Sequence, residues 1–302
     1  MKMLLILVLL VSVSVFSFNV LVPAGPTVVS VVGLLEGRVT SEVPLKIDFW
    51  RTLDQVNAQI TAKSVDIVIL PVSIGTTLYL KNVDLRLAAV TLWSGFYVVT
   101  KDLQLGSLED LNGKEIYTPQ GKGQTGDVLT RFLIGRYNLS NTSIKYAVQN
   151  EIVALMSAGK VKIAVLPEPF VTLAVKNASA SIAFDLQEIW SKLTGKPAQL
   201  PITGVFVRGD LLEKSEQLLF ALEALKRSID YAMQNKREVS ELSAKYLGGM
   251  NPAVIEQALE RTIYRYNSAK EKKEEIIFYL SVVNQIEPEA VPRVPDDDFF
   301  AF

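Results

Sequence analysis

From Phe18 onward, short apolar runs rich in β-branched residues alternate with segments of helical period. Residues 66–70 (DIVIL) have the character of a buried strand, whereas Thr52-Leu53-Asp54-Gln55 is a capping box that opens a helix. This alternation is typical of βαβ units and predicts an α/β protein whose mainly parallel sheets are flanked by helices. From Asp210 to the end, the period is helical almost throughout.

The pattern defines a set of expected elements. The expected strands cover residues 18–22, 45–50, 66–70, 85–91, 95–100, 115–117, 144–148, 161–166 and 202–207. The expected helices before residue 210 cover residues 28–35, 52–62, the segment that carries Tyr79, and residues 127–137, 151–158 and 170–177. In open α/β sheets, ligands bind beyond the carboxyl ends of the strands, so the informative residues directly follow each strand.

The domain organisation follows from how the two βα blocks are joined. The joining segments read as strands rather than as a flexible Gly/Ser-rich linker, and no repeat of solenoid period is present. A length of 302 residues suits two domains or one large one. The sequence therefore predicts a two-domain body with a cleft and strand hinges.

Composition excludes several classes of function. The 31 Lys and Arg nearly balance the 32 Asp and Glu, which gives no reason to expect nucleic acid as a partner. The chain has no His and no Cys. A Ser-His-Asp or Cys-His hydrolase, a disulfide and a Cys/His zinc site are therefore excluded. We expect no metal and no cofactor.

The first 17 residues have the layout of a secretory signal peptide. Lys2 precedes an apolar run, and Val15 and Ser17 suit the small positions before a cut at Phe18. The alternative is a retained anchor, because apolar residues continue through Val22. Since the chain has no Cys, a lipid-anchored form is excluded. We expect a secreted, extracytoplasmic protein.

Four segments resemble solute-binding proteins of ABC importers, in the group that binds sulfonates, nitrate and thiamine precursors. Residues 66–102 (DIVILPVSIGTTLYLKNVDLRLAAVTLWSGFYVVTKD) resemble the first domain of that group. Residues 110–133 (DLNGKEIYTPQGKGQTGDVLTRFL) resemble its turn and the Gly/Ser/Thr loop that opens a helix. Residues 151–177, containing ALMSAGKVKIAVLPEPF, resemble the cleft-lining part of the second domain, and residues 201–214 (PITGVFVRGDLLEK) the return crossover.

The resemblance covers nearly the whole chain after residue 17 and implies a two-lobed periplasmic-binding-protein type II fold. Two hinge crossovers are implied, near residues 95–100 and 201–207. Lobe one would comprise residues 18–99 and 204–302, and lobe two residues 100–203. The resemblance also implies a small-molecule ligand, an ABC permease in the membrane as partner, and a monomeric protein.

One loop follows the strand at residues 115–117 and precedes a helix. It contains Gln120, Gly121, Lys122, Gly123, Gln124 and Thr125. Backbone N–H groups and the positive end of the helix can hold an anion there, and glycine allows close approach of a ligand. The alternative is a flexible loop in which Thr125 only caps the helix. Asp127, in the first turn of that helix, argues against an anionic ligand.

Two further turns follow strands of the first block. Gly25 and Pro26 lie between a strand and a helix, and Pro71 and Ser73 follow the DIVIL strand. Each turn is a candidate for ligand contact, with a purely rigid turn as the alternative, because Pro and Gly are ordinary turn residues. Ser73 is expected either to donate to the ligand or to cap its helix.

Two tryptophans and one carboxylate complete the candidates. Trp50 ends the second strand and Trp93 precedes a hinge strand, so a planar ligand can stack on either unless both are core residues. Arg51 is expected at the surface, with neutralisation of an acidic ligand group as the alternative. Glu168 lies between two prolines and suits a ligand with amino donors, or else has a structural role.

These observations favour a binding protein that captures a small solute by domain closure and delivers it to a permease. Two Trp and Glu168 favour a nitrogen heteroaromatic such as a thiamine-type pyrimidine over a sulfonate. The alternatives are a lyase or biosynthetic enzyme of the same fold, and a binder of sulfonate- or nitrate-type anions. An enzyme that uses a catalytic His is excluded, because the chain has none.

Overall fold

The computed structural model describes residues 17–119 and 121–302. The expected signal peptide, residues 1–17, lies outside the described residues except for Ser17, and Gln120 lies outside them as well. The first strand begins at Phe18, whose side chain is fully buried. None of the helices within the described ranges is both long and apolar enough to cross a membrane.

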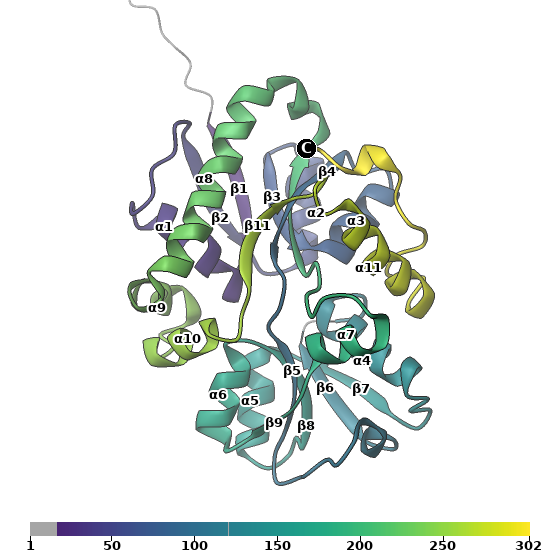
Figure 1. The fold of residues 1–302 in the computed structure, drawn as a ribbon. Helices are drawn as coiled ribbons and strands as arrows, with labels where there is room; N and C mark the ends of the chain where they lie inside the picture. The colour runs from purple at the N-terminus through teal and green to yellow at the C-terminus, as the bar shows by residue number, and fades with distance from the viewer. Residues whose placement is uncertain (1–16, 120) are drawn as a thin grey trace, which may run out of the picture.

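The first sheet forms the upper part of the molecule in Figure 1, with the strand order β11-β4-β10-β3-β1-β2. Its strands are β1 (Phe18–Pro23), β2 (Leu45–Trp50), β3 (Ile67–Pro71), β4 (Leu85–Leu92), β10 (Thr203–Arg208) and β11 (Tyr264–Ser268). β1 pairs in parallel with β2 and β3. β10 is antiparallel to β3 and β4, and β11 is antiparallel to β4.

The second sheet forms the lower part, with the order β7-β6-β8-β5-β9. Its strands are β5 (Phe96–Thr100), β6 (Glu115–Pro119), β7 (Ser143–Ala147), β8 (Ile163–Pro167) and β9 (Ser181–Asp185). The expected two-lobed α/β fold class is confirmed, but both sheets are mixed rather than mainly parallel. β5 and β10 cause the difference, because each of these strands runs antiparallel to both of its neighbours.

Helices flank both sheets. They are α1 (Val32–Leu35), α2 (Leu53–Thr61), α3 (Val72–Leu80), α4 (Thr125–Arg136), α5 (Gln149–Ser157), α6 (Phe170–Ala178), α7 (Leu186–Thr194), α8 (Ser215–Gln234), α9 (Lys236–Ser243), α10 (Pro252–Leu259) and α11 (Lys273–Ile286). Short 3-10 helices are η1 (Pro26–Ser30), η2 (Leu108–Leu111), η3 (Gly209–Lys214), η4 (Ala244–Leu247) and η5 (Asp297–Phe299). The predicted capping box is confirmed, since Thr52 Oγ1 accepts from Gln55 N at 3.3 Å.

Some expected elements differ in the structure. The helix expected at residues 28–35 is η1 followed by the single turn α1, because Pro26 starts a 3-10 segment. Three elements were not expected: β9, α7 and β11. β9 and β11 are five-residue strands at sheet edges, and β11 lies between two helices, so neither has a long apolar run to mark it.

We call the part built on the first sheet lobe one and the part built on the second sheet lobe two. β5 belongs wholly to the second sheet and β10 wholly to the first. The boundary expected at residue 99 therefore falls inside a strand of lobe two. The chain therefore passes from lobe one to lobe two at residues 93–95 and returns at residues 195–202.

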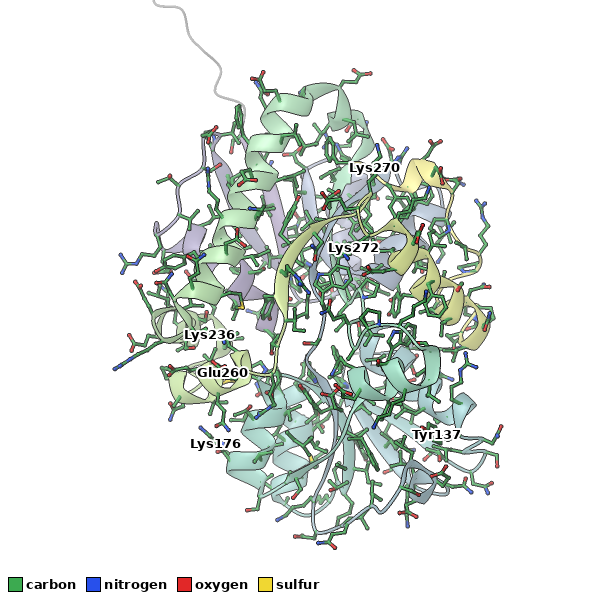
Figure 2. All side chains as sticks on the ribbon, viewed as in Figure 1. Tyr137, Lys176, Lys236, Glu260, Lys270 and Lys272 are labelled. Carbon is green, nitrogen blue, oxygen red and sulfur yellow. The ribbon has the colours of Figure 1, made fainter. Side chains whose placement is uncertain are left out.

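The lobes touch on two sides. On one side, Trp190 of α7 packs against Phe132 of α4 and against Tyr279 of α11, with ring centroids 5.2 Å and 6.0 Å away. On the other side, Lys176 Nζ of α6 donates to Ala253 O of α10 at 3.4 Å, near the residues labelled at the lower left of Figure 2. α11 and α10, both from the C-terminal part of the chain, thus hold the second lobe against the first.

Candidate functional site

A small cavity, which we call the inner chamber, lies where the strand ends of both lobes meet. Its volume is about 80 Å³. It is lined by Pro23, Ala24, Gly25, Pro26, Thr27, Trp50, Pro71, Leu92, Phe96, Thr125, Gln149, Pro167, Ile202 and Thr203. Both lobes contribute to the lining, as the cleft of a two-lobed protein requires.

Strand register explains why these residues meet. Pro23 is the register partner of Trp50, at the ends of β1 and β2. Thr203 pairs with Pro71 in lobe one, and Phe96 pairs with Pro167 in lobe two. The sequence determines the chamber largely through where each strand ends.

A wider cavity of about 620 Å³, which we call the outer groove, adjoins the chamber. It is lined by Pro23, Ala24, Trp50, Arg51, Thr52, Leu53, Asp54, Gln124, Val148 and Gln149. Pro23, Ala24, Trp50 and Gln149 line both cavities, so the groove is the approach to the chamber. Another open groove of about 650 Å³, between α4, β7 and the end of α11, lies away from the strand ends.

The lobe-one wall of the chamber is held by backbone bonds and packing. Ala24 N donates to Trp50 O at 2.8 Å. Trp50 Nε1 donates to Ile69 O at 3.1 Å, so the indole offers the chamber only its ring. Tyr264 Oη donates to Pro26 O at 3.0 Å. Burial raises the pKa of Tyr264 far above its usual range, so the phenol stays a neutral donor.

Three helices begin at the chamber. Thr125 is the first residue of α4, Gln149 the first of α5, and Pro71 the N-cap of α3. Helix N-termini carry partial positive charge and free N–H groups. The chamber therefore offers donors to acceptor atoms of a ligand, without a full charge.

The loop at residues 121–125, of which Thr125 lines the chamber and Gln124 the groove, is held in place by a buried carboxylate. Asp127 is fully buried, and its Oδ2 accepts from Gly123 N at 2.8 Å. Its Oδ1 accepts from Arg131 Nε at 2.9 Å and from Tyr146 Oη at 2.6 Å. Gly123 has φ 81°, a conformation that favours glycine. Asp127 thus holds the loop in place and lines neither cavity.

The segment that follows α11 completes this anchor. Glu287, only 6% exposed, lies 3.1 Å from Arg131 Nε and 3.4 Å from Lys122 Nζ. Burial lowers the pKa of Arg131, but the hydrogen bond with Tyr146 and the charges of Asp127 and Glu287 raise it overall. Arg131 therefore stays protonated and joins two carboxylates.

The structure brings six of the predicted site residues to the two cavities. Gly25, Pro26, Trp50, Pro71 and Thr125 line the chamber, and Trp50 and Gln124 line the groove. Their contact with a ligand stays a prediction. Gly121, Lys122 and Gly123 lie outside both linings, and Gln120 lies outside the described residues.

Ser73 and Trp93 also lie outside both linings. Ser73 is buried inside the first turn of α3 rather than at its N-cap, and its Oγ donates to Gly123 O at 3.1 Å. It therefore joins the two walls instead of capping the helix. Trp93 is 1% exposed, and its Nε1 donates to Arg265 O at 3.0 Å, so it has the core role.

Glu168 is buried and paired. Its Oε1 lies 2.6 Å from Arg261 Nη2, and its Oε2 accepts from Thr172 N at 3.0 Å. Within the described residues, one carboxylate oxygen accepts hydrogen bonds from the start of α6, and the other accepts from the segment before β11. This carboxylate braces the lobes and is not among the chamber-lining residues.

Several lining residues were missed by sequence reasoning. Gln149, Thr203 and Phe96 line the chamber, and each lies at the end of a strand or the start of the next element. Gln149 could have been found, because it follows an expected strand. Phe96 and Thr203 lie at the starts of their strands. Antiparallel pairing places these starts beside the ends of the neighbouring strands, at Pro167 and Pro71.

The lining limits what the chamber can do chemically. Among its lining residues in the described chain, none has an ionisable side chain. Thr27, Thr125, Gln149 and Thr203 supply neutral hydrogen-bonding groups beside apolar walls. Residues 17–119 and 121–302 contain no cluster of three or more carboxylates that could hold a metal. The arrangement suits recognition of an uncharged group rather than proton transfer.

The solved structures that this chain matches include several described as ABC transporters or as sulfonate- and nitrate-binding proteins. A structure described as an ABC transporter from Parabacteroides distasonis is 28% identical, with TM-score 0.77, over 94% of this chain and 98% of that chain. The aliphatic sulphonate binding protein SsuA from Escherichia coli is 14% identical, with TM-score 0.74, over 93% and 90%. The nitrate-binding protein NrtA from Synechocystis PCC 6803 is 11% identical, with TM-score 0.70, over 90% and 81%. At such identities the last two show the fold alone.

The resemblance to importer binding proteins is therefore confirmed at the level of fold. A search of curated proteins gives no match. A family model described as menaquinone biosynthesis (VitK2_biosynth) matches residues 44–273, which is more than half of the 302 residues. This chain belongs to that family.

Proposed function

We propose that this protein is the solute-binding component of an ABC importer and captures a small organic ligand between its lobes. The observation that carries the proposal is the inner chamber: strand ends of both sheets line it, and its lining in the described residues has no ionisable side chain. Binding needs only such shape and hydrogen bonding, whereas general acid–base catalysis needs a group that transfers a proton. The 28% identity to an ABC-transporter structure supports the same proposal.

The residues that line the chamber also indicate what kind of ligand it suits. Trp50 and Phe96 give apolar surface, and the threonines with the three helix starts give hydrogen-bond donors. A neutral nitrogen heteroaromatic with acceptor atoms would suit this combination. A ring needs more room than the present 80 Å³, since a cavity that holds benzene has about 150 Å³. The proposal therefore includes movement of the walls.

The movement we propose is domain closure around residues 93–95 and 195–202. In this structure the walls already touch, because Ser73 Oγ of lobe one donates to Gly123 O of lobe two. Opening would break this bond and admit the ligand. The lobes would then close on the ligand, with a wider chamber than the present one, and binding would favour that state by its differential affinity. X-ray scattering should show a smaller radius of gyration with ligand than without it. An unchanged radius would contradict closure.

Native mass spectrometry of protein purified under mild conditions tests the binding function. The expected result is one non-covalent ligand per monomer, lost on denaturation and rebound with a 1:1 stoichiometry in calorimetry. Trp50→Phe should weaken rebinding, whereas Trp93→Phe, a matched change of a core tryptophan, should alter stability but not affinity. Equal effects on affinity would contradict the placement of the ligand beside Trp50.

A second candidate is a biosynthetic enzyme of the same fold. The description of the family, menaquinone biosynthesis, favours it. Prolonged incubation of the protein with its co-purified ligand separates the two functions. Recovery of the unaltered molecule supports binding, whereas its conversion to a product of different mass supports the enzyme.

We also propose export to the extracytoplasmic space, a permease as partner and a monomeric state. Lys2 and the apolar run before Ser17 support export, as does the likeness to importer components. N-terminal sequencing of the exported protein should begin near Phe18. An intact Met1 in the exported fraction would contradict cleavage.

A further inference from the structure

The hydrogen bonds of the chain change from one lobe to the other within a single link of the first crossing. Trp93 N donates to Ile263 O at 2.9 Å, and Ser94 Oγ accepts from Ile263 N at 2.9 Å, directly before β11 of lobe one. Gly95 O, one residue further on, accepts from Glu168 N of lobe two at 2.8 Å. The boundary between the lobes at this crossing therefore lies at the link between Ser94 and Gly95.

A buried amide holds the lobe-two side of this link. Gln187 is the second residue of α7 and is 2% exposed. Its Oε1 accepts from Gly95 N at 3.2 Å and from Phe96 N at 3.0 Å. Its Nε2 donates to Phe96 O at 3.0 Å and to Asp185 Oδ1 at 2.7 Å. A primary amide has two N–H donors and one oxygen with two lone pairs, so this side chain uses its full hydrogen-bonding capacity.

Strand register explains why the amide is needed there. β9 pairs with β5 as far as Asp185, opposite Tyr97, and the chain then turns into α7. Gly95 and Phe96 lie beyond this point, where an unpaired buried N–H or C=O would cost about as much as a lost hydrogen bond. The amide of Gln187 takes the place of the missing strand. Because Phe96 lines the inner chamber, Gln187 also positions part of the chamber wall.

Gly95 gives the crossing its direction. Its φ of 128° is a backbone conformation that residues with a Cβ rarely adopt. An added Cβ would meet no atom closer than 3.5 Å, the nearest being those of Thr262. The conformation, rather than a lack of space, therefore requires glycine at this position.

The return crossing is held less firmly. Residues 195–197 are exposed, and in the part of the chain that the structure describes the main-chain hydrogen bonds of residues 195–198 join only positions two to four apart. Such a segment can follow a rotation of the lobes without directing it. The first crossing, fixed on both sides of one link, is the place where the axis of rotation is set.

We propose that Gln187 is a positioning residue that makes the link between Ser94 and Gly95 the joint of lobe movement and holds Phe96 in the chamber wall. Gln187 lines neither the chamber nor the groove, so it acts through the two residues that it holds. This inference rests on the proposed closure of the lobes. It assigns the choice of the rotation axis to an uncharged, buried side chain.

Double electron–electron resonance between two spin labels tests the joint without any ligand. Because the chain has no Cys, Ala58→Cys in α2 and Ala154→Cys in α5, both at exposed positions, place one label on each lobe. In Gln187→Leu, the population at the main distance of the labelled parent should fall about threefold or more, since the hydrogen bonds at the joint are lost. Gln187→Glu keeps an acceptor for the two N–H groups and should change the distances less.

Gly95→Ala tests the same joint while Gln187 stays in place. It disfavours the φ of 128°, so it should also lower the population at the main distance. The matched control is Gly113→Ala, at a glycine with φ 74° in the turn before β6, where an added Cβ would meet no atom within 4 Å. It should leave the distances unchanged. This pair decides the question if Gln187→Leu does not fold.

Thr142→Val is the control for a general loss of stability, because it removes a hydrogen bond from Thr142 Oγ1 to Leu111 O within lobe two. It should lower the free energy of unfolding and leave the distances unchanged. The proposal is overturned if Gln187→Leu and Gly95→Ala keep the distances of the parent, or if Thr142→Val changes them as much. If both joint variants keep these distances and native mass spectrometry still finds a co-purified molecule, the joint is overturned and the binding function stands.

Discussion

The two walls of the inner chamber are held in place by different physical means. The lobe-one wall follows the ends of β1, β2 and β3, and prolines, backbone hydrogen bonds and buried aromatic rings set its shape. In the lobe-two wall, strand residues Phe96 and Pro167 are joined by Thr125, which follows a loop that buried charged side chains hold. One of these side chains, Glu287, comes from the segment after α11. The lobe-one wall is set by its sheet, whereas the loop part of the lobe-two wall also depends on contacts between lobes.

This difference predicts which substitutions should lower stability alone and which should lower ligand affinity as well. A change behind the lobe-one wall should cost stability with little effect on ligand affinity, because the sheet keeps its shape. A change in the anchor of residues 121–125 should move the loop and so affect affinity as well. Four substitutions test this contrast.

The largest effect is expected from Asp127→Ala. The change leaves Gly123 N and Tyr146 Oη without their acceptor and removes one of two carboxylates from Arg131. Breaking a buried pair costs about 3 kcal/mol, and we expect that loss in the free energy of unfolding from urea titration, together with weaker ligand binding. The control is Asp54→Ala, an exposed acid in the first turn of α2, which should change stability by less than about 0.5 kcal/mol. Equal losses in both variants would contradict the anchor.

A smaller effect is expected from Gly126→Ala. An added Cβ would lie 2.2 Å from Thr118 Oγ1, so one of them must move. Such overpacking costs about 1–3 kcal/mol, measurable in thermal unfolding. Thr118→Ala in the same chain should recover most of the loss, because Thr118 Oγ1 is buried without a hydrogen bond.

The control in the same helix is Gly135→Ala, whose Cβ would meet no atom within 4 Å. It should stabilise the protein by about 0.5–1 kcal/mol, since glycine within a helix is unfavourable relative to alanine. A failure of Thr118→Ala to rescue the Gly126 variant would show that the close approach is not the cause.

On the lobe-one side, Tyr264→Phe removes the hydrogen bond to Pro26 O and keeps the ring. A net loss of about 1 kcal/mol in unfolding free energy is expected. Ligand affinity should stay within twofold, because the bonds from Ala24 N to Trp50 O and from Val28 N to Gly25 O still hold the turn that contains Pro26. A larger fall in affinity would mean that the lobe-one wall is as adjustable as the lobe-two wall.

The smallest effect concerns Lys122 and Glu289, which are 2.5 Å apart at the surface. The hydrogen bond from Lys122 lowers the pKa of Glu289 from its ordinary 4.5. A lowered carboxyl pKa stabilises the fold above the ordinary value, and the contribution is lost as pH falls through the lowered pKa. Lys122→Ala should therefore be slightly less stable than the unmodified protein at pH 6–8, and this small difference should shrink in acid. A large loss at pH 7 would contradict a minor role for the exposed pair.

Much of the fold was predictable because its signals are local. Residues 45–50 and the capping box at Thr52 were placed correctly, since apolar runs and capping residues determine them directly. β9 and β11 were missed, because edge strands this short are stabilised by pairing with β5 and β4 rather than by their own sequence. The mixed character of the sheets was missed for the same reason, since strand direction depends on connections.

The candidate site shows the same distinction between residues that local sequence signals place and residues that depend on distant partners. Trp50, Pro71 and Gly25 line the chamber, because each ends an expected strand or lies in the turn after one. Glu168 was expected to bind amino donors of a ligand or else to have a structural role, and Arg261, 93 positions away in sequence, pairs with it. No local pattern indicates a partner so distant.

The anchor of the lobe-two loop also has a consequence for the order of folding. Lys122 pairs with Glu289 across 167 positions, and Thr77 Oγ1 of lobe one donates to the neighbouring Ala290 O. A chain that emerges N-terminus first can pair β1 with β2 and β3 long before these last partners exist. Contacts so distant in sequence form late, because closing a long loop has a large entropic cost. Pulse-labelled hydrogen exchange should accordingly show the Gly123 amide protected after the amides of β3, so that binding competence is acquired at the end of folding.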